Sequence, residues 1–158
     1  MLGRSLKTAL IALLFISLSN SLWASSTIDA VIAPVRTFPG CQPIEGENPP
    51  VSLQAGMFFH YDTEKGEASL RPVAKKFESF RCGKRVATIY MYEYRDEQVA
   101  REALSHATVL IWGGNKASSH HPEAVFTVQN TLVVVSTRKP QELTDLILGR
   151  TEGNAKHD

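Results

Sequence analysis

The N-terminal segment, residues 1–24, most constrains what this chain can fold into, because it decides how much of the sequence belongs to the folded protein. Arg4 and Lys7 precede an uncharged apolar run at residues 8–18, and after a short polar stretch the small residue Ala24 follows. A positively charged start, a short apolar run and a small residue at the break are typical of a cleaved export signal. We therefore expect cleavage after Ala24 and a mature protein that is periplasmic or secreted.

An uncleaved membrane anchor is the alternative interpretation of this segment. A spanning helix needs about 20 predominantly apolar residues, whereas this run ends at the polar triplet of residues 19–21. A lipid anchor would need a cysteine directly after the apolar run, and the first cysteine of the chain is Cys41. The sequence therefore favours a protein with no membrane attachment after signal cleavage.

The rest of the chain, residues 25–158, has the length of one domain and a nearly balanced charge. The whole sequence has 17 basic and 16 acidic residues, a formal net charge of +1, and Arg4 and Lys7 leave with the signal. A near-neutral chain without a dense run of Lys or Arg lacks the charge that binding to a phosphate backbone requires. We therefore expect no nucleic-acid partner.

The chain has 2 cysteines, Cys41 and Cys82. An even number of cysteines in an exported protein predicts a disulfide. By the loop-entropy relation, a bond across this sequence separation contributes about 4 kcal/mol to stability. Neither cysteine lies in a C-x-x-C pair, and neither is in a setting that lowers a thiol pKa, so a catalytic thiol is disfavoured.

Three regions follow the signal in our interpretation. Residues 25–50 are rich in proline and glycine, which predicts an extended arm that Cys41 would tie to the body. Residues 51–149 carry strand and helix patterns and are predicted to form a single α+β domain. Residues 150–158 are polar, and we expect a disordered tail.

Within the predicted domain, runs of β-forming residues alternate with helical patterns. The β-rich runs lie at residues 51–61, 86–94, 108–112, 124–128 and 132–136. Asp96 is placed to cap an amphipathic helix at 97–107, and a second helix begins at Pro140 and ends at Gly149. Asn130 can take a left-handed backbone and close a hairpin. Residues 68–85 suit a helix and a strand equally well.

This order of elements predicts an α+β fold with a small antiparallel-dominated sheet and about two helices on one face. A ferredoxin-like variant is the first choice of topology, although no matching final strand follows Gly149. One disulfide completes the prediction.

Tyr90, Tyr92 and Tyr94 alternate along the strongest predicted strand, so they share one face of it. An exposed face of this kind could bind a sugar, a peptide or another protein, whereas helices packed on the same face would bury the rings as core. Burial is the favoured interpretation, and the sequence leaves the alternative open.

The candidate metal ligands are His120, His121 and Glu123, in a polar segment between predicted strands. Imidazole and carboxylate groups suit zinc or copper, and His60 or His106 could supply a further nitrogen. The spacing fits no established metal motif such as H-E-x-x-H, and a solvated loop with surface histidines is the simpler explanation.

Two other groups of residues could carry chemistry. Ser118 and Ser119 lie beside His120, but a serine hydrolase would be expected to show a G-x-S-x-G elbow, which the sequence lacks. Gly113 and Gly114 precede Lys116, which could meet an anion, but neither nucleotide-binding glycine pattern is present. A tight turn is the favoured explanation for the glycines.

The function that these observations favour is a non-catalytic binding or interaction module in the periplasm. Its partner would be another exported protein or a small ligand, with no cofactor. The alternative is a small metal-dependent hydrolase that uses His120, His121 and Glu123. A third possibility is a protein that inhibits or chaperones another exported protein through an exposed sheet edge or the proline-rich arm.

Overall fold

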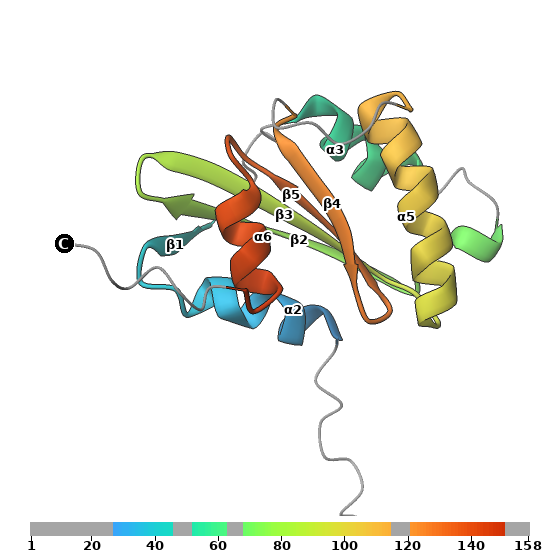
Figure 1. Ribbon diagram of the computed structural model, residues 1–158, viewed down its shortest axis with the longest axis horizontal. Helices are drawn as coiled ribbons and strands as arrows, with labels where there is room; N and C mark the ends of the chain where they lie inside the picture. Colours follow the sequence, from blue (N-terminus) through green and yellow to red (C-terminus); the bar gives the residue numbers. More distant parts are fainter. Residues whose placement is uncertain (1–26, 46–51, 63–67, 115–120, 151–158) are drawn as a thin grey trace, which may run out of the picture.

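The computed structural model describes residues 27–45, 52–62, 68–114 and 121–150. They form an α+β fold of four α-helices and one five-stranded antiparallel sheet, with strand order β1-β2-β3-β5-β4 (Figure 1). The predicted α+β class is confirmed. The elements are α2 (Thr27–Arg36), β1 (Cys41–Ile44), α3 (Leu53–Met57), β2 (Ala74–Cys82), β3 (Arg85–Glu93), α5 (Glu97–Trp112), β4 (Glu123–Val128), β5 (Thr131–Ser136) and α6 (Gln141–Ile147). Among the helices in these ranges, none has the length and hydropathy to cross a bilayer.

Strand β3 is the centre of the sheet and confirms the strand expected at residues 86–94. Tyr90 and Tyr92 point to one face, and Ile89 and Met91 point to the other; all four are buried. The favoured interpretation of the tyrosines is thus confirmed: they are core, packed against Phe58 and Phe59 and the apolar side of α5.

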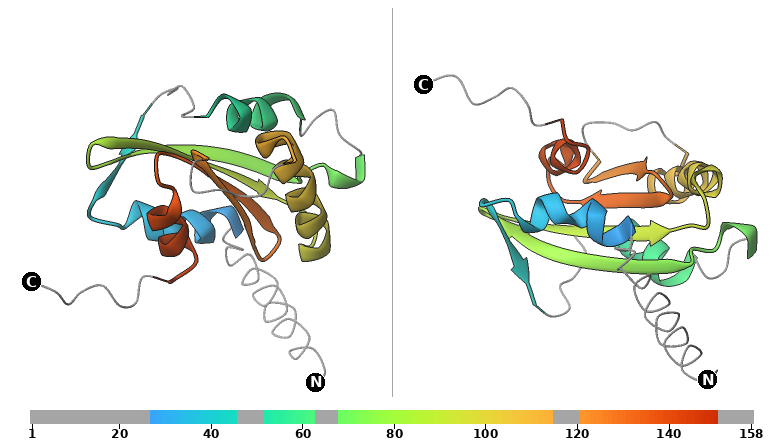
Figure 2. Two further views of the ribbon diagram at one scale, coloured as in Figure 1. Left: turned by 45° about the horizontal axis from the view of Figure 1, so that its top comes forward. Right: turned by 90° about the horizontal axis from the view of Figure 1, so that it is seen from below.

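The helices cover both faces of the sheet, so the expectation of two helices on one face is wrong. Helices α3 and α5 pack on the tyrosine face, and α2 and α6 pack on the opposite face (Figures 1 and 2). The cause lies in the inner strands, because β5 is apolar on both sides. Its Leu132 and Val134 point to the first face, and Val133 and Val135 to the second.

The topology also differs from a ferredoxin-like arrangement. The chain passes from β3 through α5 to β4 at the sheet edge, and β5 then pairs between β3 and β4. This half matches a ferredoxin-like unit. In a ferredoxin-like fold, a final strand after Gly149 would pair with β3, but here the earlier strand β2 occupies that position. In addition, α6 lies on the face opposite α5.

Within residues 25–50, the expectation of a wholly extended arm is wrong, because residues 27–36 form helix α2. Pro34 lies inside this helix, where the lost hydrogen bond and steric clash cost about 3 kcal/mol. The compensating contribution is an apolar stripe buried against the sheet and α6: Ile28, Val31, Ile32 and Val35.

Strand β1 is short and tolerates Pro43 because of its register. Cys41 lies opposite Cys82 with their Cα atoms 4.1 Å apart, a separation typical of a non-hydrogen-bonded antiparallel pair. Pro43 and Phe80 therefore also form a non-hydrogen-bonded pair, so the missing N–H of Pro43 would have faced away from β2.

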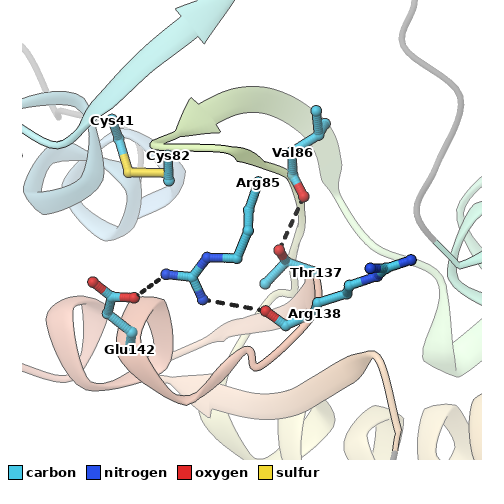
Figure 3. Close-up of a disulfide and its surroundings, with 7 residues drawn as sticks. All are labelled: Cys41, Cys82, Arg85, Val86, Thr137, Arg138 and Glu142. Carbon is cyan, nitrogen blue, oxygen red and sulfur yellow. Dashed lines mark hydrogen bonds and ion pairs between the residues drawn. A yellow bond between two sulfur atoms is a disulfide. The ribbon is translucent and has the colours of Figure 1, made fainter.

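The predicted disulfide between Cys41 and Cys82 is confirmed (Figure 3). It joins β1 to the end of β2, next to the tight turn into β3. On the same side, the Arg85 guanidinium forms an ion pair with Glu142 of α6 and donates to the Arg138 carbonyl at 3.3 Å. The Thr137 hydroxyl donates to the Val86 carbonyl at 2.9 Å. The β2–β3 turn is thereby tied both to β1 and to the start of α6.

Two segments that precede β3 in the sequence differ from the sequence-based expectation or resolve it. Residues 51–61 were expected to form a strand, but they contain α3, followed by a π-helical turn, η1 (Phe58–Asp62). The helix begins because the Ser52 hydroxyl accepts the Ala55 N–H at 3.1 Å. The ambiguous residues 68–85 contain a short 3-10 turn, η2 (Ala68–Leu70), and strand β2.

Helix α5 begins as predicted, since the Asp96 carboxylate accepts the Val99 N–H at 2.9 Å. The β-rich run at residues 108–112 is not a strand, because the helix continues to Trp112. Ala107 and Ile111 extend the buried side of the helix by one more turn. Gly113, with a φ of 64°, then ends it.

The hairpin of β4 and β5 and the final helix α6 confirm the elements expected there. Gln129, with a φ of 52°, takes the left-handed position that we had assigned to Asn130. The Asn130 side chain instead donates to the Tyr94 carbonyl at 2.7 Å, which ties this turn to the end of β3.

Candidate functional site

A row of buried polar side chains crosses four strands of the sheet. Ser79 of β2 lies opposite Thr88 of β3, Thr88 lies opposite Ser136 of β5, and Ser136 lies opposite Glu123 of β4. All four residues are buried. They share a face with Tyr90 and Val134, since residues two apart in a strand point the same way. The row therefore lies on the α3 and α5 side, in an otherwise apolar layer.

Hydrogen bonds occupy the first three members of this row. The Ser79 and Thr88 hydroxyls are 3.0 Å apart, and the Ser136 hydroxyl accepts the Ser52 N–H at 2.9 Å. Ser52 thus caps α3 and also attaches the helix to the sheet. These hydroxyls are bound to neighbours that hold the fold together, which is a structural use of buried polar groups.

Glu123 ends the row in a different environment. Its side chain is 3% exposed, and Oε2 has no hydrogen-bond partner within the described residues. His121 Nδ1 is 3.9 Å away, and the His121 ring stacks on the Trp112 indole with 5.8 Å between ring centroids. Trp112 Nε1 is likewise buried without a partner in the described part of the chain. The structure therefore brings together an acidic group, an imidazole and an indole N–H.

The structure brings together two of the predicted metal candidates, His121 and Glu123. His120 lies outside the described residues. His60 and His106 are exposed, and the His60 ring contacts Phe77 of β2. Because β2 and β4 are three strand spacings apart, about 14 Å, His60 lies far from Glu123.

A metal site needs more ligands than this pair supplies. Structural zinc takes four protein ligands and catalytic zinc three. No group of three or more His, Cys, Asp or Glu side chains able to hold a metal occurs in the ranges that the structure describes. Ser118, Ser119 and Lys116 lie outside those ranges. Gly113 and Gly114 both have left-handed backbones and form the turn that ends α5.

A second feature is a hollow at the sheet edge, with a volume of about 280 Å³. It lies at the point where the pairing of β1 with β2 ends. Its lining comes from the end of β1 and the middle of β2: Pro43, Ile44, Phe77, Glu78 and Ser79. Ser79 is also the first member of the polar row, so the hollow opens at one end of that row.

Charged groups beside the hollow are paired with one another. Glu78 is in contact with Arg36 of α2, and Lys76 Nζ lies 2.9 Å from Glu78. Burial raises the pKa of Glu78, but the hydrogen bonds from Arg36 and Lys76 outweigh this effect and leave the pKa below its usual value. The same ion pair raises the pKa of Arg36. Asp29 of α2 also pairs with Arg36, at 3.2 Å. The α2 side of the hollow is therefore polar, and its two basic and two acidic groups balance.

Sequence analysis missed both the polar row and the hollow. A signal for the row existed, because Thr88 and Ser136 interrupt apolar strands on the same face as Tyr90 and Val134. The hollow had no such signal, since it depends on β1 being shorter than β2.

Comparisons with known proteins give no family assignment. No protein-family model matches the chain, and neither a curated protein nor a solved structure is significantly similar to it. The function must therefore be argued from the geometry of the chain itself.

Proposed function

We propose that this protein is an exported, non-catalytic binding module whose partner is a segment of another exported protein. The observation that carries the proposal is the hollow at the end of β1. Helices pack on both faces of the sheet, so a partner can reach the sheet at its edges. At this edge, Ile44 and Phe77 are half-buried and face a space large enough for side chains of a partner.

Export is supported by the sequence of residues 1–24 and by the disulfide. A cross-link between Cys41 and Cys82 is expected to persist in an oxidising compartment and to be rare in the cytosol. N-terminal sequencing of the protein recovered from the periplasmic fraction tests this part of the proposal. A chain that starts at Ser25 supports it, and an unprocessed chain confined to the cytosol would contradict it.

The binding role is tested by site-specific photo-crosslinking in living cells. A photo-reactive residue at the position of Ile44 is expected to yield one major adduct with another exported protein. The same residue at the position of Leu53, which is 67% exposed on α3, is the matched control and should not yield that adduct. Identical adducts from both positions, or none from Ile44, would count against the proposal.

A metal-dependent hydrolase that uses His120, His121 and Glu123 is the second candidate. The observation that favours it is the buried, unpartnered Oε2 of Glu123 beside His121. Metal analysis of the purified protein tests it. Stoichiometric zinc or copper that is lost in both His121→Ala and Glu123→Gln would favour this candidate, and a metal-free protein would eliminate it.

A further inference from the structure

We propose that the partner segment binds as an additional antiparallel β-strand on β2, opposite Phe77 and in line with β1. This inference rests on the proposed binding function and specifies its mode. It follows from the backbone of β2, whose outer side is paired with β1 along only part of its length. Strand β2 has 9 residues, and β1 pairs with the last 4 of them, Ser79 to Cys82.

The direction of the backbone groups of Phe77 follows from the register. The Gly83 N–H donates to the Gly40 carbonyl at 3.2 Å, so the backbone groups of Gly83 point toward β1. Successive residues of a strand alternate in this direction. Ser79 and Phe77 therefore also point their N–H and C=O groups toward the β1 side.

Phe77 is the first of these positions that lies beyond β1. The pairing with β1 stops at Ile44 and Ser79, and within the described residues no backbone group pairs with Phe77 on that side. An unpaired donor and acceptor on a strand edge are what an added strand satisfies. The hollow lies at this same point, between Ile44 and Phe77.

The walls of the hollow define the chemistry of the added strand. The Phe77 ring is on the α3 and α5 side, where it contacts Phe59 and Tyr90. The side chains of Lys76 and Glu78 point to the α2 side, where Glu78 is paired with Arg36. A strand residue opposite Phe77 should therefore be apolar, and its two neighbours polar. It cannot be proline, since its N–H must bond to the Phe77 carbonyl.

A displayed library of nine-residue peptides, selected against the mature protein with its disulfide intact, tests this inference. The selected peptides should share an apolar residue flanked by polar ones. Ile44→Asp, which places a charge in the hollow, should weaken them by about tenfold or more. Leu53→Asp adds the same charge at an exposed site of α3 and should leave the affinity unchanged.

N-methylation of a selected peptide separates strand pairing from simple apolar contact. A methyl group on the amide that faces Phe77 should lower affinity about tenfold through the lost hydrogen bond, whereas methylation of the next amide should have little effect. Independently of any variant, bound peptide should slow hydrogen exchange of the Phe77 amide.

The possible failures are distinguishable. If methylation of either amide lowers the affinity equally, or if bound peptide does not slow exchange of the Phe77 amide, strand addition is overturned while the binding function stays in place. A library without binders, together with no adduct from the Ile44 position in cells, would overturn both.

Discussion

Glu123 combines two properties that seldom occur together in a stable core. Its side chain is almost fully buried, and Oε2 lacks a hydrogen-bond partner in the described part of the chain. Burying a carboxylate without full pairing is costly. His121 at 3.9 Å is too far for a direct hydrogen bond, so the cost is only partly offset.

We expect Glu123→Met to raise the free energy of unfolding by about 1 kcal/mol, since it replaces the carboxylate by an apolar group of similar length. Urea denaturation at neutral pH measures the change. Glu97→Met, at an exposed position of α5, is the control and should have little effect. A clear loss of stability in Glu123→Met would show that the carboxylate has a stabilising partner.

Burial also changes the acidity of the core tyrosines. It raises the pKa of Tyr90 to about 12 and also raises the pKa of Tyr94. Because an unfolded tyrosine ionises near pH 10, the unfolded chain loses protons first. The contribution of each neutral tyrosine to the free energy of unfolding is therefore complete below pH 10. It decreases as the pH rises toward the pKa in the folded protein.

For Tyr90 this loss should reach about 1.4 kcal/mol at pH 11. The difference between urea denaturation free energies at pH 8 and pH 11 measures it. Tyr90→Phe should show a smaller difference between the two pH values, although its stability at pH 8 is close to that of the unmodified chain. An equal pH effect in both proteins would refute the assignment to Tyr90.

At the scale of the elements, the helix caps make the clearest prediction. The Asp96 carboxylate accepts the Val99 N–H at the start of α5. Asp96→Ala should lower the free energy of unfolding by about 1 kcal/mol. Asp96→Asn should lower it much less, because Asn also caps helices well. Thermal denaturation followed by circular dichroism compares the three proteins. Equal losses for Ala and Asn would indicate that charge, rather than capping, is responsible.

Local patterns predicted the elements whose residues agree with their surroundings. The alternation in residues 86–94 and the Asp96 cap led directly to β3 and to the start of α5. The β-forming residues 108–112 were misleading, because burial of Ile111 and Trp112 on the helix outweighs their weak preference for strands. Residues 53–57 were likewise predicted as a strand and form a helix, since the Ser52 cap and the hydrogen bond between Ser52 and Ser136 favour a helix there.

At the scale of the whole molecule, the disulfide is the main covalent constraint. Its two cysteines are 41 positions apart, so Cys82→Ser should lower the free energy of unfolding by about 4 kcal/mol in the loop-entropy model. Chemical denaturation measures the loss. The double variant with Cys41→Ser should be no less stable than Cys82→Ser alone. Thiol titration of the denatured, unreduced protein should detect no free thiol, and two per chain would contradict the bond.

The global arrangement was less predictable than the elements. Cys41 and Cys82 indicated a bond from their number and their expected compartment alone. Val133 and Val135 of β5 are covered by α2 and α6, on the face opposite α5. This arrangement was not predicted, because Pro34 disfavours a helix at residues 27–36. His121 and Glu123 were selected because both side chains can bind metals, and two residues this near in sequence are expected to lie close in space. The contact of His121 with the Trp112 indole could not be predicted.

Helices α2 and α6 lie near the two ends of the chain and bury the same apolar cluster, which contains Ile28 and Val31 of the first helix and Leu143 and Ile147 of the last. Closure of that half of the core joins segments that are far apart in the sequence, so it requires both helices together and should be slower than the pairing of the adjacent strands β4 and β5.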